Sequence, residues 1–209
     1  MHEAVQRESK AARDSAGILD ASTLGKIDIQ GTDASEFLNR VYTNAWSKLE
    51  IGKCRYGLML NEDGMVYDDG VTTRLDENHY IMTTTTGGAA TVLGKLEDYL
   101  QTEWPELDVY LTSVTDHYAT ISVCGPNSKK IIQKVIPEID LSDKDFPHMS
   151  FKNSKIGNVK CRVMRISFTG EQSYEINIQA NYAKSVWENC MEAGNCLLYT
   201  SPSPRDGLL

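Results

Sequence analysis

The sequence predicts an α+β fold in which helices pack on antiparallel sheets. Strands and helices mix along the chain, and hairpins dominate because turn residues separate short runs of β-branched and aromatic residues. This pattern differs from the regular alternation of a doubly wound parallel sheet. The order of a strand, a helix, further strands and a helix occurs twice, over about 25–103 and 107–193. Two related lobes are therefore expected.

The chain should open with a polar, helix-prone segment at residues 3–16, followed by a short strand at 27–29. Asp33 and Glu36 have the spacing of a capping box, so a helix should begin at Asp33. Its apolar stripe comprises Ala34, Phe37, Leu38 and Val41.

A meander of three antiparallel strands should follow, over residues 56–60, 65–75 and 80–86. The segment Asn61-Glu62-Asp63-Gly64 has the composition of a hairpin turn, in which Gly64 can adopt a positive φ. The first two strands should therefore pair directly across this turn.

The remaining elements follow from periodicity and from helix start and stop residues. They are a helix that follows Gly87-Gly88 and ends before Pro105, strands at 107–114 and 118–123 that alternate like a pair, a helix after Pro126, a long loop over 137–155, strands at 159–168 and 174–178, and a helix capped by Asn181.

The regular pattern of helices and strands ends near residue 194, so we expect the domain to end there. Residues 1–194 should form the domain, with lobes at about 20–105 and 106–194. Residues 195–209 do not continue the pattern and should be a non-native or disordered tail, with residues 197–209 packing on nothing.

Composition excludes several classes of function. The 29 acidic residues exceed the 21 basic ones, which gives a net charge of −8, a sign that disfavours binding to nucleic acid or anionic membranes. No apolar run is long enough to span a bilayer, and the charged start lacks a signal peptide, so a cytoplasmic protein is expected. The five cysteines are scattered, which favours buried thiols over disulfides or zinc.

Several catalytic motifs are absent from the sequence. It contains no phosphate-binding loop, no dinucleotide-binding glycine motif and no nucleophile elbow. The four histidines are isolated from one another and from the cysteines, so no metal site is expected.

The adjacent carboxylates Asp68 and Asp69 are unusual inside an expected strand, because aspartate is a poor strand former. The two-residue period of a strand sends them to opposite faces, so one can be solvated while the other points inward. An inward carboxylate suits binding an N–H-rich ligand or accepting a proton. On pattern alone, a solvated pair beside a turn remains the commoner interpretation.

Glu175 lies between Tyr174 and Ile176 in an apolar segment that follows the turn Thr169-Gly170. A carboxylate in this position can accept two parallel N–H bonds from an aminopyrimidine edge. On pattern alone, an outward glutamate in an alternating strand is favoured.

These segments together resemble a known family. Residues 61–69, Asn-Glu-Asp-Gly-Met-Val-Tyr-Asp-Asp, resemble the N-[ED]-x-G-x-[VI]-x-D-D motif of glycine-cleavage T-protein aminomethyltransferases. Residues 168–175 are similar to that family's Y-T-G-E-x-G-x-E motif. Within the superfamily the resemblance is closer to the alpha subunits of heterotetrameric sarcosine oxidases, on the segments 20–31, 37–44, 82–90, 102–105 and 165–171.

The resemblance implies a tetrahydrofolate-binding segment that captures the one-carbon unit of sarcosine oxidation as 5,10-methylenetetrahydrofolate. It assigns Asp68 as the catalytic carboxylate and Glu175 as the acid that holds the pterin ring. With them, Tyr56, Leu24 and Thr85 fall at other pocket positions, as does Phe168, which replaces a tyrosine of T-proteins.

The resemblance further implies that the chain is a fragment. FAD, FMN and NAD are expected in the full complex but outside this segment, and a flavin-bearing beta subunit is the expected partner. A true T-protein of the glycine cleavage system is the alternative. A non-catalytic folate-binding protein of iron–sulfur assembly is disfavoured, because no Gly-Gln-Glu follows Gly52-Lys53-Cys54-Arg55-Tyr56.

Overall fold

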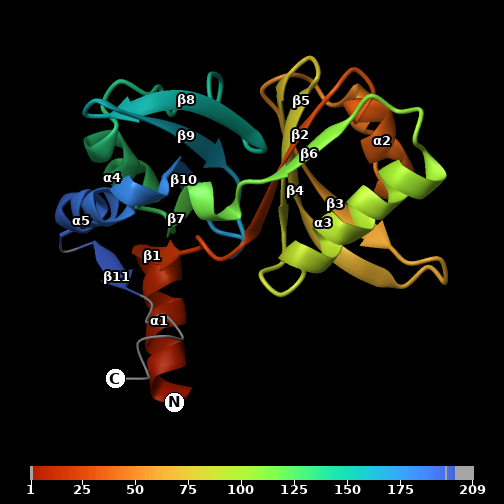
Figure 1. Cartoon of the computed structure of the whole chain (residues 1–209). Coiled ribbons are helices and arrows are strands. Elements are labelled where there is room, and N and C mark those ends of the chain that lie inside the picture. The colour runs from red at the N-terminus through yellow and green to blue at the C-terminus, as the bar shows by residue number, and fades with distance from the viewer. Residues whose placement is uncertain (1, 196, 201–209) are drawn as a thin grey trace. The chain divides into compact units, whose positions relative to one another are not determined.

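The computed structural model describes residues 2–195 and 197–200 and divides into two compact units. The central unit comprises Thr23–Asp116, and the flanking unit comprises Met1–Ser22 together with His117–Leu209. Each unit combines one sheet with helices, which confirms the predicted α+β class (Figure 1). The sequence did not indicate that the first 22 residues would join the later part of the chain.

The central unit carries a five-stranded sheet of order β3-β4-β5-β2-β6, in which all neighbours are antiparallel. Its elements are β2 (Gly25–Gln30), α2 (Ala34–Val41), the short helix η1 (Trp46–Lys48), β3 (Cys54–Leu60), β4 (Val66–Asp76), β5 (His79–Thr84), α3 (Ala89–Asp98), the π-helical turn η2 (Tyr99–Glu103) and β6 (Tyr110–Ser113); η3 (Thr115–His117) follows at its border.

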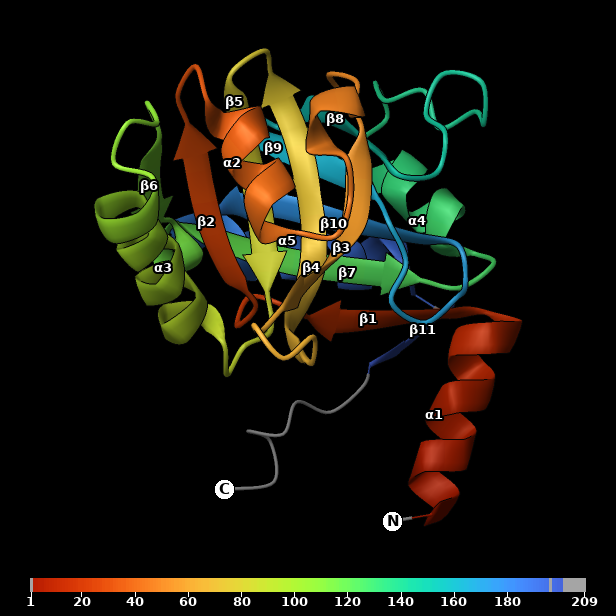
Figure 2. The same cartoon turned by 90° about the vertical axis from the view of Figure 1, so that its right-hand side faces the viewer.

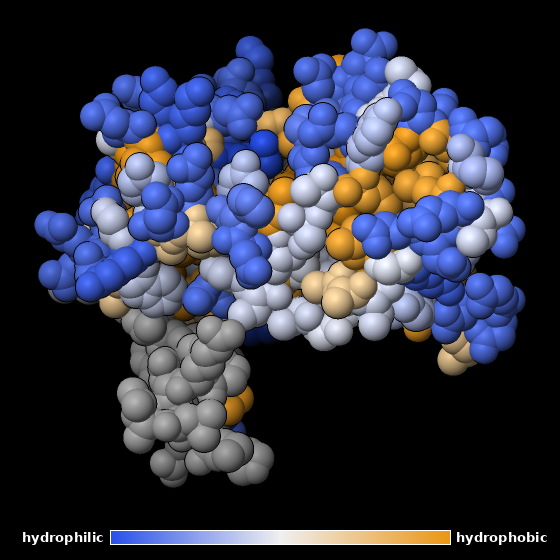
Figure 3. Space-filling view, in the orientation of Figure 1, coloured by the Kyte–Doolittle hydropathy of each residue, from blue (hydrophilic) through white to orange (hydrophobic). Residues whose placement is uncertain are grey.

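The helices α2 and α3 cover one face of this sheet (Figures 1 and 2). Alternation along the strands supplies the apolar side chains beneath them, as in β2, where Ile27 and Ile29 are buried and Asp28 is not. The core consists of Ile27, Ile29, Ala34, Phe37, Leu38, Tyr42, Trp46, Leu49, Met59, Tyr80, Met82, Val92 and Leu96. Hydrophobic residues also reach the surface between α2 and α3 (Figure 3).

The predicted hairpin of residues 56–75 is confirmed by the pairing of β3 with β4. Gly64 closes the turn at φ 79°, and its N–H donates to the carbonyl oxygen of Asn61 at 2.9 Å. A residue without a Cβ adopts this left-handed conformation at little cost, which is why the turn ends on glycine. The hairpin places Asp68 on β4 opposite Met59.

The flanking unit carries a six-stranded sheet of order β11-β1-β7-β10-β9-β8, antiparallel except between β1 and β11. Its elements are α1 (His2–Asp14), β1 (Ala16–Asp20), β7 (Tyr118–Cys124), α4 (Ser128–Val135), β8 (Ser150–Ile156), β9 (Val159–Arg165), β10 (Ser173–Gln179), η4 (Ala180–Tyr182), α5 (Ala183–Ala193) and β11 (Leu198–Thr200).

One face of this sheet packs against α4 and α5, and the strands alternate accordingly (Figure 1). On β10, Tyr174, Ile176 and Ile178 belong to the hydrophobic core. Glu175 and Asn177 therefore point to the opposite face of the sheet.

Some sequence-based expectations were wrong. Residues 107–114 and 118–123 do not pair, because β6 joins β2 in the central unit while β7 lies between β1 and β10 in the flanking unit. The expected loop over 137–155 ends earlier, because β8 begins at Ser150 and pairs with β9.

The predicted helix starts are confirmed only in part. Asp33 is the N-cap residue of α2, as expected, but makes no side-chain cap, because its carboxylate accepts the backbone N–H of Asp108 at 2.9 Å. Asn181 lies within η4, and Tyr182 precedes α5 without a side-chain cap.

The chain end differs from the expected loose tail as far as Thr200. Leu198–Thr200 forms β11 beside β1, and the carbonyl oxygen of Leu197 accepts the Ser15 hydroxyl at 2.8 Å. Leu197 is partly buried against the core of the flanking unit. Residues 201–209 lie outside the described residues, and the non-native origin of the tail stays a prediction.

Alanine substitutions at two glycines test how closely the backbone packs in the central unit. Gly31 has φ 137°, and a Cβ there would overlap the carbonyl oxygen of Asp108, whereas Gly64 has φ 79° and open space around it. Gly31→Ala should lower the free energy of unfolding by about 1–3 kcal/mol more than the control Gly64→Ala, because only Gly31→Ala adds a collision with backbone. Chemical denaturation measures both values, and equal losses would contradict this packing.

Candidate functional site

The carboxylate of Asp68 is held inside the central unit. Asp68 is 4% exposed and shares the helix-covered face of the sheet with its cross-strand neighbour Met59. Asp69 points to the other face, where its Oδ2 accepts the Tyr56 hydroxyl at 2.9 Å. The expected placing of the two carboxylates on opposite faces is therefore confirmed, whereas the commoner interpretation from pattern alone, a solvated pair, was wrong for Asp68.

Thr85 provides the hydrogen-bond donors for Asp68. Its hydroxyl donates to Oδ1 at 2.6 Å, and its backbone N–H lies 3.4 Å from Oδ1 and 3.3 Å from Oδ2. The same hydroxyl oxygen accepts the backbone N–H of Gly88 at 3.2 Å. The segment between β5 and α3 thus wraps around one buried carboxylate.

Gly88 makes this close approach possible. A Cβ at Gly88 would lie 2.7 Å from both Asp68 Oδ1 and the Thr85 hydroxyl oxygen. Gly88 also directly precedes α3, so the carboxylate lies at the start of a helix, where the helix dipole favours negative charge.

Burial raises the pKa of Asp68 above its ordinary value, and the negative charge of Asp69 raises it further. The two hydrogen bonds from Thr85 act in the opposite direction and lower that pKa. A carboxyl group with a raised pKa is suited to accept a proton and return it during a reaction.

Tyr42 is a nearby residue that the sequence analysis did not single out as functional. Its hydroxyl is buried and has no hydrogen-bond partner among the described residues. Burial raises the pKa of Tyr42, and the charges of Asp68 and Asp69 raise it further. In the sequence it was indistinguishable from an ordinary core aromatic residue.

The other predicted pocket residues of the central unit are placed as follows. Thr85 contacts Asp68 directly, whereas Tyr56 is 51% exposed and contacts Asp69 instead. Leu24 is half-buried, and its carbonyl oxygen accepts the ammonium group of Lys26 at 3.1 Å. The structure therefore joins Thr85, but not Tyr56, to the buried carboxylate.

In the flanking unit, Glu175 belongs to a buried row of polar side chains on the face opposite α4 and α5. We call this row the polar strip; it comprises Thr120, Ser122, Ser173, Glu175 and Asn177, which are between 2% and 8% exposed. Ser122 is the cross-strand neighbour of Glu175, and Thr120 is that of Asn177. Glu175 is 8% exposed, so the prediction from pattern alone of an outward glutamate was wrong.

The sequence contained a signal for this strip that was missed. Polar residues alternate with apolar ones in Tyr174-Glu175-Ile176-Asn177-Ile178 and in Thr120-Ile121-Ser122-Val123. Such alternation normally indicates a solvated face, and only the structure shows that the polar members are buried.

Phe168 was expected at a pocket position of the site. It lies in the irregular segment between β9 and β10 and is 91% exposed. The neighbouring Glu171 is held by an ion pair with Arg13 at 3.0 Å. The structure gives the Phe168 ring no packing role within the flanking unit.

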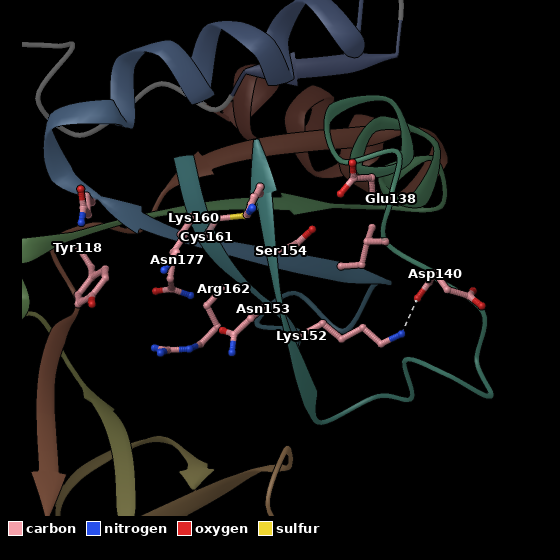
Figure 4. Close-up of a pocket in the computed structure, with 13 residues that line it drawn as sticks. Tyr118, Glu138, Asp140, Lys152, Asn153, Ser154, Lys160, Cys161, Arg162 and Asn177 are labelled. Carbon is pink, nitrogen blue, oxygen red and sulfur yellow. Dashed lines mark hydrogen bonds between the residues drawn. The ribbon is translucent and has the colours of Figure 1, made fainter. Parts of the chain in front are cut away.

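A cavity of about 830 Å³ continues from the polar strip toward β8 (Figure 4). Asn177 belongs to both the strip and the cavity wall. The other lining residues include Tyr118, Glu138, Asp140, Lys152, Asn153, Lys155, Lys160 and Arg162. Four basic against two acidic side chains make this wall positive in a chain of net charge −8.

Within residues 2–195 and 197–200, no group of three or more His, Cys, Asp or Glu side chains could hold a metal ion. In the same part of the chain, none of the helices has the length and apolar character needed to cross a membrane. Cys54, Cys124, Cys161 and Cys190 are buried as free thiols.

Comparison with known proteins gives consistent relatives. The family model described as the GCVT N-terminal domain matches residues 1–199. The chain is 54% identical to the sarcosine oxidase subunit alpha of Corynebacterium sp. (strain U-96) and 50% identical to that of Rhizobium meliloti, over 93% and 92% of its length. It spans only 20% of the length of either relative. An aminomethyltransferase of Caldanaerobacter subterraneus is 33% identical over 92% of this chain and 50% of its own length.

Two solved structures share the fold. The glycine cleavage system aminomethyltransferase T from Bartonella henselae has a TM-score of 0.79 and 22% identity, over 94% of this chain and 50% of that one. A chain of the heterotetrameric sarcosine oxidase from Corynebacterium sp. U-96 has a TM-score of 0.64 and 14% identity, over 97% and 96% of the two chains. Identities this low support the fold alone.

The hydrogen bond from Thr85 can be tested by titration. Thr85→Val removes the hydroxyl that stabilises the charged form of Asp68, so the pKa of Asp68 should rise further. Thr86→Val is the matched control, because the Thr86 hydroxyl oxygen lies 3.2 Å from that of Thr23. Carbon-13 NMR of the aspartate carboxyl groups measures the shift.

The same titration has a consequence for stability. The pKa of Asp68 is raised by folding, so its contribution to stability is present below its unfolded pKa and is lost as pH rises through the folded value. Thr85→Val should move that loss to higher pH. An unchanged carboxyl titration in Thr85→Val would contradict the geometry described for Asp68.

Proposed function

The chain belongs to the GCVT N-terminal domain family, and we propose that it is the tetrahydrofolate-binding segment of a sarcosine oxidase alpha subunit. In this role it captures the one-carbon unit released by amine oxidation as 5,10-methylenetetrahydrofolate. The burial of Asp68, which matches the family's catalytic aspartate, carries the proposal, because a raised carboxyl pKa suits proton transfer.

Tetrahydrofolate would supply the two nitrogens that take up the one-carbon unit, N5 of the pterin ring and N10 of the aminobenzoyl group. Asp68 orients the N10 region and holds its proton on a carboxylate oxygen, while the Thr85 hydroxyl fixes the carboxylate from the protein side. Because Thr85 donates its closest hydrogen bond to Oδ1, Oδ2 is the oxygen less engaged by that residue.

Glu175 serves the pterin ring. Its carboxylate is an acceptor in a strip of hydroxyl and amide groups, a chemistry that fits the paired N–H donors of an aminopyrimidine edge. Asp68 and Glu175 stand on different units, and their assignment to one folate rests on the family motifs. Tyr56, Phe168 and Leu24 remain proposed pocket residues on the same basis.

The relatives support a proposal about the wider assembly. The identity of 54% to a sarcosine oxidase alpha subunit, against 33% to an aminomethyltransferase, favours an oxidase over a glycine-cleavage enzyme. We therefore propose a flavin-bearing beta subunit as partner, with FAD, FMN and NAD bound outside this segment, and a cytoplasmic location. Buried free thiols fit a reducing compartment.

Asp68→Asn in the full-length protein should slow methylenetetrahydrofolate formation roughly 10²-fold or more, because a general acid–base group is lost. Product should be diverted to free formaldehyde, while flavin reduction by sarcosine stays at the parent rate. Asp69→Asn, which changes the outward carboxylate, is the matched control. Stopped-flow and product analysis measure both steps, and an Asp68→Asn enzyme with the parent transfer rate would remove Asp68 from the mechanism.

Glu175→Gln should weaken tetrahydrofolate binding roughly 10- to 100-fold, because pterin N–H donors lose a charged acceptor. Glu171→Gln is the matched control from the same segment, since Glu171 pairs with Arg13. Isothermal titration of the full-length protein gives both affinities. Equal affinities for the two variants would exclude Glu175 from the folate site.

A further inference from the structure

The side-chain nitrogen of Asn177, Nδ2, is buried and makes no hydrogen bond to the described residues. The residue as a whole is 6% exposed. Buried amide donors are nearly always paired in native proteins, because an unpaired one loses its hydration without compensation. This donor therefore requires a partner that is external to the described chain.

The orientation of the amide is fixed from one side. The hydroxyl of Thr120, the cross-strand neighbour on β7, donates to Asn177 Oδ1 at 2.8 Å. A hydroxyl that donates to Oδ1 leaves Nδ2 as the free end of the amide. Figure 4 shows Asn177 at the wall of the cavity together with Tyr118 and Arg162.

The position of Asn177 relative to Glu175 is set by the strand. The two residues are separated by one position on β10 and share the face opposite the core residues Tyr174, Ile176 and Ile178. A buried acceptor, Glu175, thus lies beside a buried donor, Asn177 Nδ2, about 6.6 Å apart along the strand at ~3.3 Å per residue.

A pterin presents the complementary sequence of groups along one edge. Its 2-amino group and N3–H are donors, and the C4 carbonyl next to N3 is an acceptor. If the Glu175 carboxylate accepts hydrogen bonds from the 2-amino group and N3–H, the C4 carbonyl still lacks a donor. That donor must come from a residue next to Glu175.

We propose that Asn177 is a specificity-determining residue that donates from Nδ2 to the C4 carbonyl of the pterin held by Glu175. The inference rests on the proposed function and deepens it: the site selects 4-oxo pterins against 4-amino analogues. An amide N–H suits this task, because it can donate to a C4 carbonyl but would face another donor in a 4-amino group. Thr120 acts as a positioning residue that holds the amide in this orientation.

The test compares two ligands on the full-length protein: tetrahydrofolate and its analogue with an amino group in place of the C4 oxygen. The readout is the ratio of their dissociation constants, which a general loss of stability does not change. Asn177→Leu should lower the preference for tetrahydrofolate about ten-fold, the usual effect of one hydrogen bond to a ligand. Asn177→Asp offers an acceptor and should lower the preference further.

Asn153→Leu is the matched control, because Asn153 lines the same cavity from β8. It should leave the ratio unchanged. Thr120→Val should lower the preference by less than Asn177→Leu does, because the amide donor remains but is no longer held in one orientation.

The outcomes separate this inference from the proposed function. If the parent protein binds no tetrahydrofolate, the proposed function fails. If it binds and Glu175→Gln weakens binding, but Asn177→Leu and Asn177→Asp keep the parent ratio, the function stands. In that case water satisfies Nδ2, and the inference about Asn177 is overturned.

Discussion

Removing a carboxylate from water costs free energy that a fold offsets with donors or with a raised pKa, and two carboxylates here are subject to that constraint. Asp68 is 4% exposed and meets the cost with the Thr85 hydroxyl, the start of α3 and a raised pKa. Glu175 is 8% exposed and lies in a strip of small polar side chains. Gly88 leaves room for the Asp68 carboxylate, and the hydroxyl residues of β7 place polar groups beside Glu175.

The two sites use the two faces of a strand differently. In the central unit the catalytic candidate shares the face that α2 and α3 cover. Two residues further along β4, Gly70 lies so close to β5 that a Cβ there would overlap the carbonyl oxygen of Thr83. In the flanking unit the polar strip lies opposite the helices, and the core residues of β10 fix its direction.

The local sequence pattern predicted those elements that have clear alternation of apolar and polar residues or a clear turn motif. The hairpin of β3 and β4 followed from alternation and from one glycine turn, and the placing of Asp68 and Asp69 on opposite faces followed from the period of the strand. The strand β1 was missed because Ala16–Asp20 is short and joins a helix without a turn signal. The edge strand β8 was missed because Lys152, Asn153 and Lys155 make it resemble a loop.

The candidate site was only partly predictable for a related reason. Motifs identified Asp68 and Glu175, but burial depends on what packs on a face, and alternation alone cannot give it. Asn177 therefore resembled any solvated strand residue, and Phe168 was expected at a pocket position although its side chain is exposed.

A crystal structure of the full-length protein with tetrahydrofolate bound tests the central claim most directly. The account predicts the Glu175 carboxylate within about 3 Å of the 2-amino and N3 nitrogens of the pterin, and Asp68 beside the N10 region. A folate bound with its pterin ring away from both carboxylates would contradict it.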